Sequence, residues 1–221
     1  MIVPMNQLSP RAKKWLSDVL GVDFKASKHI HSHQDEVFKI ETPSLNYYLK
    51  ISATLKAERD NLKKLELLLN VPRVIDFYES DNADYLLISE LPGKNLVELI
   101  GEWSAPKITE VFAKAIRQLH IINAVKVFPQ ANPKDVLLHG DMALPNIIIS
   151  EQEEIGYIDF GQLTFGLPEL DLADGIWSLQ RNLGPNYGEL FLKEYGPVQI
   201  TSVVEKALAF RYQPDKTHNA D

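Results

Sequence analysis

Residues 138–161 read LHGDMALPNIIISEQEEIGYIDFG, and our predictions of the fold and of its chemistry start from these residues. It places His-Gly-Asp at 139–141, an asparagine at 146 and Asp-Phe-Gly at 159–161. The apolar segments NIIIS and IGYID flank a short polar stretch, which predicts two strands joined by a turn. Such a return path brings Asp159 close to Asn146, so that three oxygen-bearing side chains, with Asp141 as the third, converge at one end of a small hairpin.

Carboxylate and amide oxygens suit Mg²⁺, which is usually held by one or two protein groups together with substrate phosphates. Phosphoryl transfer also needs a carboxylate that orients the attacking hydroxyl. Asp141 can orient the hydroxyl, and Asn146 with Asp159 can bind the metal. Asp-Phe-Gly alone is also typical of a plain turn at a strand end. Its combination with His-Gly-Asp and the five-residue step from Asp141 to Asn146 favours a site for phosphoryl transfer.

The rest of the chain changes character near Leu91-Pro92-Gly93. Up to that point we predict a small antiparallel sheet, with two or three strands over 27–51 and two more in VPRVIDFYE and DYLLISE. Beyond it the pattern is mostly helical, and the cleanest amphipathic stripe runs over 104–120. Helices are predicted over 9–20, 55–69, 104–120, 168–183, 188–195 and 201–212. The sequence therefore predicts an α+β chain of two lobes, 1–91 and 92–221.

These motifs resemble those of the aminoglycoside phosphotransferase family, which shares the protein-kinase-like fold with the choline kinases. The resemblance spans roughly residues 27–212. It implies that Asp141 is the catalytic base, that Asn146 and Asp159 bind Mg²⁺, and that the nucleotide is ATP, with GTP as the alternative. It also implies that His139 orients the catalytic loop and that Asp171 supports this loop from a buried position.

The resemblance extends to the nucleotide-binding half. Lys50 in YYLKI matches the lysine that reaches the nucleotide phosphates, and Glu58 matches the helix glutamate that pairs with it. By spacing alone, a solvated surface pair is the alternative. Tyr48 matches an aromatic residue that stacks on adenine, and a tyrosine of the strand core is the alternative. The remaining nucleotide contacts that the resemblance implies are the backbone of the inter-lobe hinge and one apolar side chain at the pocket floor. They are Ser89, Glu90, Leu91 and Ile158.

The nucleotide loop departs from the family pattern, because KHIHSHQDEVFKI contains no glycine. Glycines there normally let backbone N–H groups approach phosphate. Ser32 or His33 would lie at the tip and could donate to a phosphate instead. His29, His31 and His33 alternate and would share one face of a strand. A metal site is one interpretation of that pattern, and a polar loop near the nucleotide is the other.

The acceptor side also departs from the pattern. Members of the family carry a helical insertion between the helix that ends in Leu-His and the catalytic loop, and it contacts a cationic substrate. Here only residues 121–138 separate His120 from His139. We therefore expect an acceptor wall that is shorter than that of the aminoglycoside kinases.

Composition narrows the function classes. The chain has 221 residues, 45% of them hydrophobic and 24% charged, which is ordinary for a globular protein. It contains no cysteine, which excludes disulfides, thiolate catalysis and cysteine metal sites. With 23 Lys and Arg against 30 Asp and Glu, the net charge of −7 argues against nucleic acid or an anionic membrane as partner. No transmembrane or secretory segment is predicted, so we expect a cytoplasmic protein.

Three functions remain open. The first is a kinase that transfers the γ-phosphoryl group of a nucleotide to a hydroxyl of a small polar acceptor. The second is a small atypical protein kinase, and the third is a nucleotide-binding module with little turnover. The sequence leaves the acceptor and the oligomeric state undetermined.

Overall fold

The computed structural model describes residues 8–29 and 36–197, and the chain divides into two compact units, Met1–Leu91 and Pro92–Asp221. The expected elements at 30–35 and 201–212 lie outside the described residues. The first unit contains five antiparallel strands in the order β1-β2-β3-β5-β4, with two helices. Its strands are β1 (Lys25–Lys28), β2 (Glu36–Glu41), β3 (Asn46–Ser52), β4 (Val74–Glu79) and β5 (Asp84–Ser89). Its helices are α1 (Pro10–Leu20) and α2 (Lys56–Leu65).

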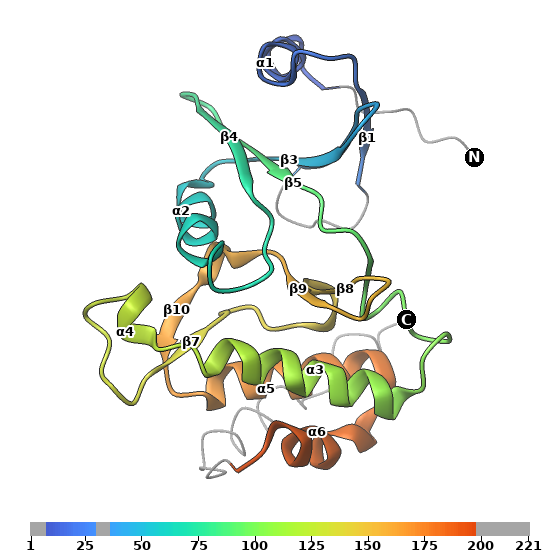
Figure 1. Ribbon diagram of the computed structural model, residues 1–221, viewed down its shortest axis with the longest axis vertical. Coiled ribbons are helices and arrows are strands. Elements are labelled where there is room, and N and C mark those ends of the chain that lie inside the picture. Colours follow the sequence, from blue (N-terminus) through green and yellow to red (C-terminus); the bar gives the residue numbers. More distant parts are fainter. Residues whose placement is uncertain (1–7, 30–35, 198–221) are drawn as a thin grey trace, which may run out of the picture. The chain divides into compact units, whose positions relative to one another are not determined.

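Alternation along the strands gives this sheet two different faces. Leu49 of β3 is fully buried in a core that also contains Phe38, Leu87 and, from α1, Leu16. The next residues along β3, Tyr48 and Lys50, lie on the opposite face, which α2 covers. Figure 1 shows α1 on one side of the sheet and α2 on the other. The helix inserted after the third strand is therefore present, as the sequence predicts.

Helix α2 ends four residues earlier than the 55–69 predicted from its leucine stripe. The stripe consists of Leu55, Leu62, Leu65 and Leu69. Of these, Leu62 and Leu65 are buried, whereas Leu67, which follows the helix, is 93% exposed. The amides of Leu68 and Leu69 both donate to the Leu65 carbonyl, which closes a turn in place of further helix. Pro72 follows shortly afterwards, and the residue before a proline disfavours helical backbone. The leucine pattern therefore continues along the sequence for four residues beyond the end of the helix.

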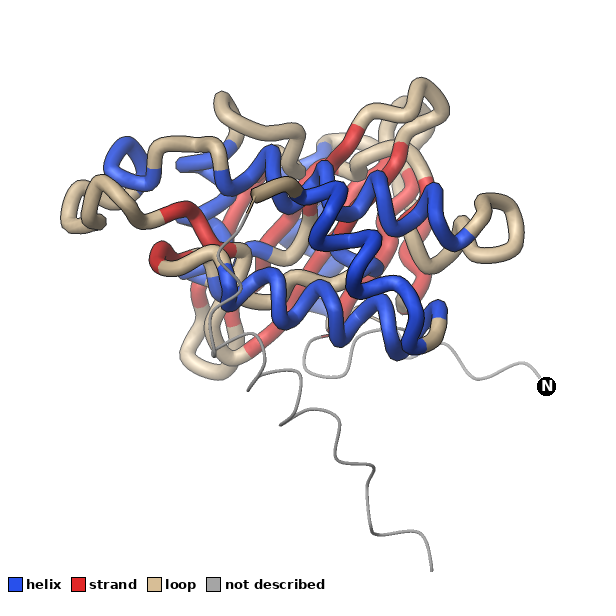
Figure 2. The backbone as a smooth tube through the Cα atoms, turned by 90° about the horizontal axis from the view of Figure 1, so that it is seen from below, coloured by secondary structure: helices blue, strands red, loops and turns tan. Residues whose placement is uncertain are grey.

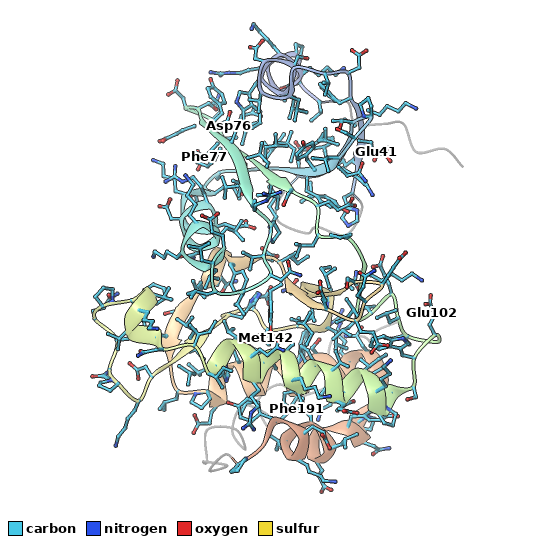
Figure 3. All side chains as sticks on the ribbon, in the orientation of Figure 1. Glu41, Asp76, Phe77, Glu102, Met142 and Phe191 are labelled. Atoms are coloured by element: carbon cyan, nitrogen blue, oxygen red, sulfur yellow. The ribbon has the colours of Figure 1, made fainter. Side chains whose placement is uncertain are left out.

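The second unit is mainly helical. Its long helices are α3 (Ala105–His120), α5 (Glu169–Leu183) and α6 (Gly188–Tyr195), and α4 (Ala124–Val127) is a single turn. The three long helices pack against one another, and Figure 2 shows the helices from below. Ser104 caps α3 by accepting from the Lys107 amide, as its position in the sequence predicts. Phe191 of α6, labelled in Figure 3, lies 5.8 Å from Phe112 of α3, measured between ring centroids.

Two small sheets complete this unit. Strands β6 (Lys94–Asn95), β8 (Ile147–Ile149) and β9 (Ile155–Tyr157) form one antiparallel sheet. Strands β7 (Val136–Leu138) and β10 (Thr164–Gly166) form the other. The hairpin β8–β9 is the one predicted from the sequence, whereas β6, β7, β10 and α4 were not predicted. The first unit is a small antiparallel sheet with an inserted helix and the second is helical with a catalytic-loop hairpin, which confirms the predicted two-lobed fold class.

Candidate active site

The segment 139–146 is fixed by side chains of α5. The carboxylate of Asp171 accepts the amide of His139 at 2.7 Å and the amide of Gly140 at 3.1 Å. Asp171 is 1% exposed, so these charge-assisted bonds form away from water. This is the buried support that the family resemblance implies for Asp171.

A second layer of buried polar groups holds Asp171 itself. His120, the last residue of α3, lies with Nε2 3.2 Å from Asp171 Oδ2 and Nδ1 2.9 Å from the Tyr195 hydroxyl. Burial raises the pKa of Tyr195, so the hydroxyl stays protonated and can donate to Nδ1. His120 then donates from Nε2 to Asp171. These bonds join the ends of α3 and α6 to the start of α5. The sequence does not predict this network, because His120 lies 75 positions from Tyr195 and 51 positions from Asp171.

His139 is also positioned by its surroundings. Its side chain is fully buried, its Nε2 donates to the Ile158 carbonyl at 2.9 Å, and its ring lies 4.5 Å from that of Phe160. Burial lowers the pKa of His139, which keeps the imidazole neutral. Nδ1 has no hydrogen-bond partner within the described residues. This hydrogen bond and this ring contact hold the His-Gly-Asp motif against the Asp-Phe-Gly motif.

Asp141 and Asn146 are joined directly. The Asn146 side-chain nitrogen donates to the Asp141 backbone carbonyl at 2.8 Å and lies 3.4 Å from Asp141 Oδ2. Asn146 is 8% exposed, whereas Asp141 is exposed. With its nitrogen occupied, the Asn146 side chain presents its carbonyl oxygen as the remaining acceptor. The exposed Asp141 carboxylate and the buried Asn146 amide therefore lie side by side in this loop.

The hairpin β8–β9 carries Asp159 back to the same end. Ile158 donates its amide to the Asn146 carbonyl at 3.1 Å, so Asn146 and Ile158 face each other across the hairpin and Asp159 follows at once. Asp159 has φ 69° and ψ 53°, a left-handed conformation that few residues other than glycine adopt. The donor set of one carboxylate and one amide oxygen fits Mg²⁺, which takes oxygen ligands and keeps several that are not from protein.

The described residues contain no group of three His, Asp or Glu side chains that could hold a metal ion by themselves. Mg²⁺ does not need such a group, because substrate phosphates complete its coordination. Of the three alternating histidines, His31 and His33 lie outside the described residues, as does Ser32. The interpretation of this loop as a metal site or as a phosphate contact therefore stays a prediction.

In the first unit, Lys50 and Glu58 form a buried ion pair. Lys50 Nζ lies 2.6 Å from Glu58 Oε1, and the two side chains are 12% and 4% exposed. The alternative of a solvated surface pair is therefore wrong. Burying such a pair costs desolvation, and removing one of its partners is strongly destabilising.

Tyr48 lies two residues before Lys50 on the same face and is partly exposed. The His29 ring contacts it edge-on, with centroids 5.8 Å apart. Tyr48 is thus on the face away from the core that Leu49 enters, which excludes its alternative role as a tyrosine of the strand core.

The segment Ser89 to Leu91 has most of its backbone donors in use. The Ser89 amide donates to the Arg73 carbonyl and the Glu90 amide to the Asn46 carbonyl. The Glu90 carboxylate lies 2.8 Å from Lys39 and accepts from the Asn46 side chain at 2.7 Å. Within the described residues the Leu91 amide donates no hydrogen bond.

No helix among the described residues has both the length and the apolar character needed to cross a membrane.

Comparison with known proteins identifies the family. The model of the phosphotransferase enzyme family matches residues 124–207, and the model of the RIO domain matches residues 16–165. An aminoglycoside 3'-phosphotransferase of Niallia circulans is 24% identical over 247 aligned positions, covering 87% of this chain and 93% of that protein. A probable aminoglycoside 3'-phosphotransferase of Lactococcus lactis is 41% identical over 67 residues, but this covers only 30% of the chain and 26% of that protein.

The solved structures agree on the fold. An aminoglycoside phosphotransferase of Streptomyces rimosus, in complex with ADP and streptomycin, superposes with a TM-score of 0.69 at 21% identity, covering 91% of this chain and 97% of that one. The alignment with the Niallia circulans enzyme is longer than the 221 residues of this chain, so that enzyme has segments without a counterpart here. The RIO-domain model covers more than half of the chain, so the chain belongs to the RIO-domain family, and it shares the protein-kinase-like fold with the aminoglycoside phosphotransferases that it matches.

Proposed function

We propose that this protein binds Mg²⁺ with ATP and transfers the γ-phosphoryl group to a hydroxyl of a small polar acceptor. The observation that carries the proposal is the anchored loop, in which Asp171 holds the amides of 139 and 140 while Asn146 bonds to the Asp141 carbonyl. This arrangement holds an exposed carboxylate beside an amide oxygen with little freedom to move. Preorganised groups of this kind supply much of the catalysis in phosphoryl transfer, which depends on positioning and electrostatics.

Each residue has a defined part in this proposal. Asp141 orients the acceptor hydroxyl and takes its proton as the acceptor oxygen bonds to the γ-phosphorus and the bond from phosphorus to the β-phosphate oxygen breaks, which releases ADP. Asn146 and Asp159 would hold Mg²⁺, which when bound neutralises phosphate charge. Lys50, oriented by Glu58, contacts the nucleotide phosphates.

The adenine contacts are proposed on the first unit. The Leu91 amide donates to the base, because the amides of Ser89 and Glu90 are already committed. Tyr48 stacks on the base from the partly exposed face of β3. For Ile158 of the second unit, the nucleotide contact that the family resemblance implies stays a prediction. ATP is proposed as the nucleotide, with GTP as the alternative.

Two findings bear on the acceptor. Relatives that cover most of the chain are named for aminoglycosides, and one was solved with streptomycin. The chain, however, lacks segments that the Niallia circulans enzyme has, and only 18 residues separate α3 from His139. We therefore propose an acceptor of the amino-alcohol or aminoglycoside class, held by fewer protein contacts than in that enzyme.

A test measures ADP release with a panel of aminoglycosides and amino alcohols, using the wild-type chain and the Asp141→Ala variant. Acceptor-dependent release that Asp141→Ala loses by about 10³-fold or more would support the proposal. Asp159→Ala should lose turnover that depends on Mg²⁺ while the protein stays folded. If the chain binds nucleotide but turns over no acceptor, the proposed phosphotransferase activity is refuted, and the nucleotide-binding module is the function that remains.

A protein kinase is the second candidate, because residues of this chain are 33% identical over 92 positions to the human hormonally up-regulated neu tumor-associated kinase. That match covers 42% of this chain and 12% of the kinase. Incorporation of phosphate into added casein or histone, with no transfer to the small acceptors, would replace the first candidate by the second.

A further inference from the structure

Helix α5 holds the catalytic loop at a second point, two turns beyond Asp171. The Ser178 side chain accepts the Leu144 amide at 2.9 Å, and Ser178 is 1% exposed. Ser178 lies seven positions after Asp171, about two helical turns, which places both on the same face of the helix. One face of α5 therefore contacts the loop near Asp141 and again near Asn146.

The Leu144 amide needs a partner that its own segment cannot provide. Leu144–Asn146 form a short 3-10 helix, and the first amides of a helix have no acceptor within it. Ala143 stands at the position of the N-cap, and its side chain offers no acceptor. Pro145 has no N–H, and the Asn146 amide already donates to the Ala143 carbonyl at 3.0 Å. Ser178 thus supplies from another helix the cap that the sequence of the loop omits.

This cap lies two residues before Asn146. The short helix that begins at Leu144 sets the direction of Asn146, and the Asn146 carbonyl in turn accepts the Ile158 amide that precedes Asp159. A shift at Leu144 is therefore transmitted to both side chains proposed to bind the metal. Asp171 fixes the other end of the loop, at His139 and Gly140.

We infer that Ser178 is a positioning residue for the metal, acting through the Leu144 amide on Asn146 and Asp159. The inference rests on the proposed function, because it concerns the same metal. Partners that orient metal ligands without touching the ion typically change metal affinity by 10–100-fold when they are removed. Ser178→Ala removes the acceptor and leaves a buried amide unsatisfied.

The experiment measures binding of Mn²⁺ to the chain in the presence of saturating ADP, from the free Mn²⁺ signal in electron paramagnetic resonance. Thr109→Val is the matched control. Thr109 is a fully buried helix hydroxyl of the same unit, but it donates to the Ala105 carbonyl of its own helix at 2.8 Å. Thermal unfolding of both variants measures the structural cost of losing one buried hydroxyl.

We expect Ser178→Ala to weaken Mn²⁺ binding about 10-fold and Thr109→Val to leave it unchanged, with comparable losses of thermal stability. Ser178→Cys, which keeps the shape of the side chain with a weaker acceptor, should give a smaller loss, and it serves if Ser178→Ala does not fold. If Ser178→Ala binds Mn²⁺ with wild-type affinity, the inference about Ser178 is overturned and the proposed function is not. The same holds for Ser178→Cys if that variant is used instead. A wild-type chain that binds no Mn²⁺ with ADP overturns the proposed function together with it.

Discussion

Gly140 lies between His139 and Asp141, and its replacement by alanine should damage catalysis more than folding. Its φ is +82°, and a Cβ built there would lie 2.4 Å from the Gln162 carbonyl oxygen. Ordinary contact begins at 3.4 Å, so the two backbone segments must separate by about 1 Å. The left-handed conformation adds roughly 1–2 kcal/mol of strain for an alanine. Because Asp141 is the next residue, its carboxylate moves with this displacement.

A misplacement of about 1 Å can cost roughly 10²-fold in rate. We therefore expect Gly140→Ala to lower kcat about 100-fold on whichever acceptor the panel identifies, with a smaller change in KM for ATP. Steady-state kinetics and thermal unfolding are measured side by side.

Gly101→Ala is the matched control. Gly101 also has a positive φ, +95°, but a Cβ there would meet nothing within 4 Å. It should show the strain in thermal unfolding and keep the wild-type kcat. A Gly140→Ala enzyme that retains the wild-type kcat would refute the reasoning, because the contact with Gln162 would then not constrain Asp141.

The other expected outcomes concern single buried groups. Tyr157→Phe removes a hydroxyl that donates to the Ala115 carbonyl at 2.8 Å. The loss of about 1 kcal/mol should lower the melting temperature by about 2–4 °C, and an unchanged melting temperature would contradict this prediction. Lys50→Ala should lower the free energy of unfolding in urea by about 3 kcal/mol, because it removes one partner of an ion pair whose side chains are 12% and 4% exposed. A loss below about 1 kcal/mol, as for a surface pair, would argue against a buried pair. Burial lowers the pKa of His139 below 6.5. Just below pH 6.5 the unfolded chain therefore binds a proton on His139, whereas the folded chain keeps this imidazole neutral. The free energy of unfolding should therefore decline below pH 6.5 by up to about 1.4 kcal/mol per pH unit, and His139→Gln should show a shallower decline.

The sequence predicted the elements whose patterns are local. Helix α3 has a capping serine, a proline in its first turn and one apolar face, and its bounds agree with the prediction within one residue. The pair of isoleucine-rich segments predicted β8 and β9, and the motif spacing brought Asp141, Asn146 and Asp159 to one end of that hairpin.

What the sequence did not predict depends on contacts between distant residues. Strands β7 and β10 pair with each other across more than 20 residues of sequence, and neither has an apolar run framed by turn residues like those that predicted β8 and β9. The capping role of Ser178 has no local signal, since a serine inside a helix is usually neutral or unfavourable there. The hydrogen bonds of the Ser89 and Glu90 amides are accepted by the carbonyls of Arg73 and Asn46, which lie on other segments of the chain.

The attachment of the catalytic loop to α5 also has a consequence for hydrogen exchange. Amides of surface loops normally exchange with solvent quickly, because brief local openings expose them. The amides of His139, Gly140 and Leu144 donate to side chains of a buried helix instead. They can exchange only when the loop detaches from α5 or when α5 itself unfolds. In deuterium these three amides should be among the slow ones of the second unit, and the loop and the helix should open as one cooperative unit.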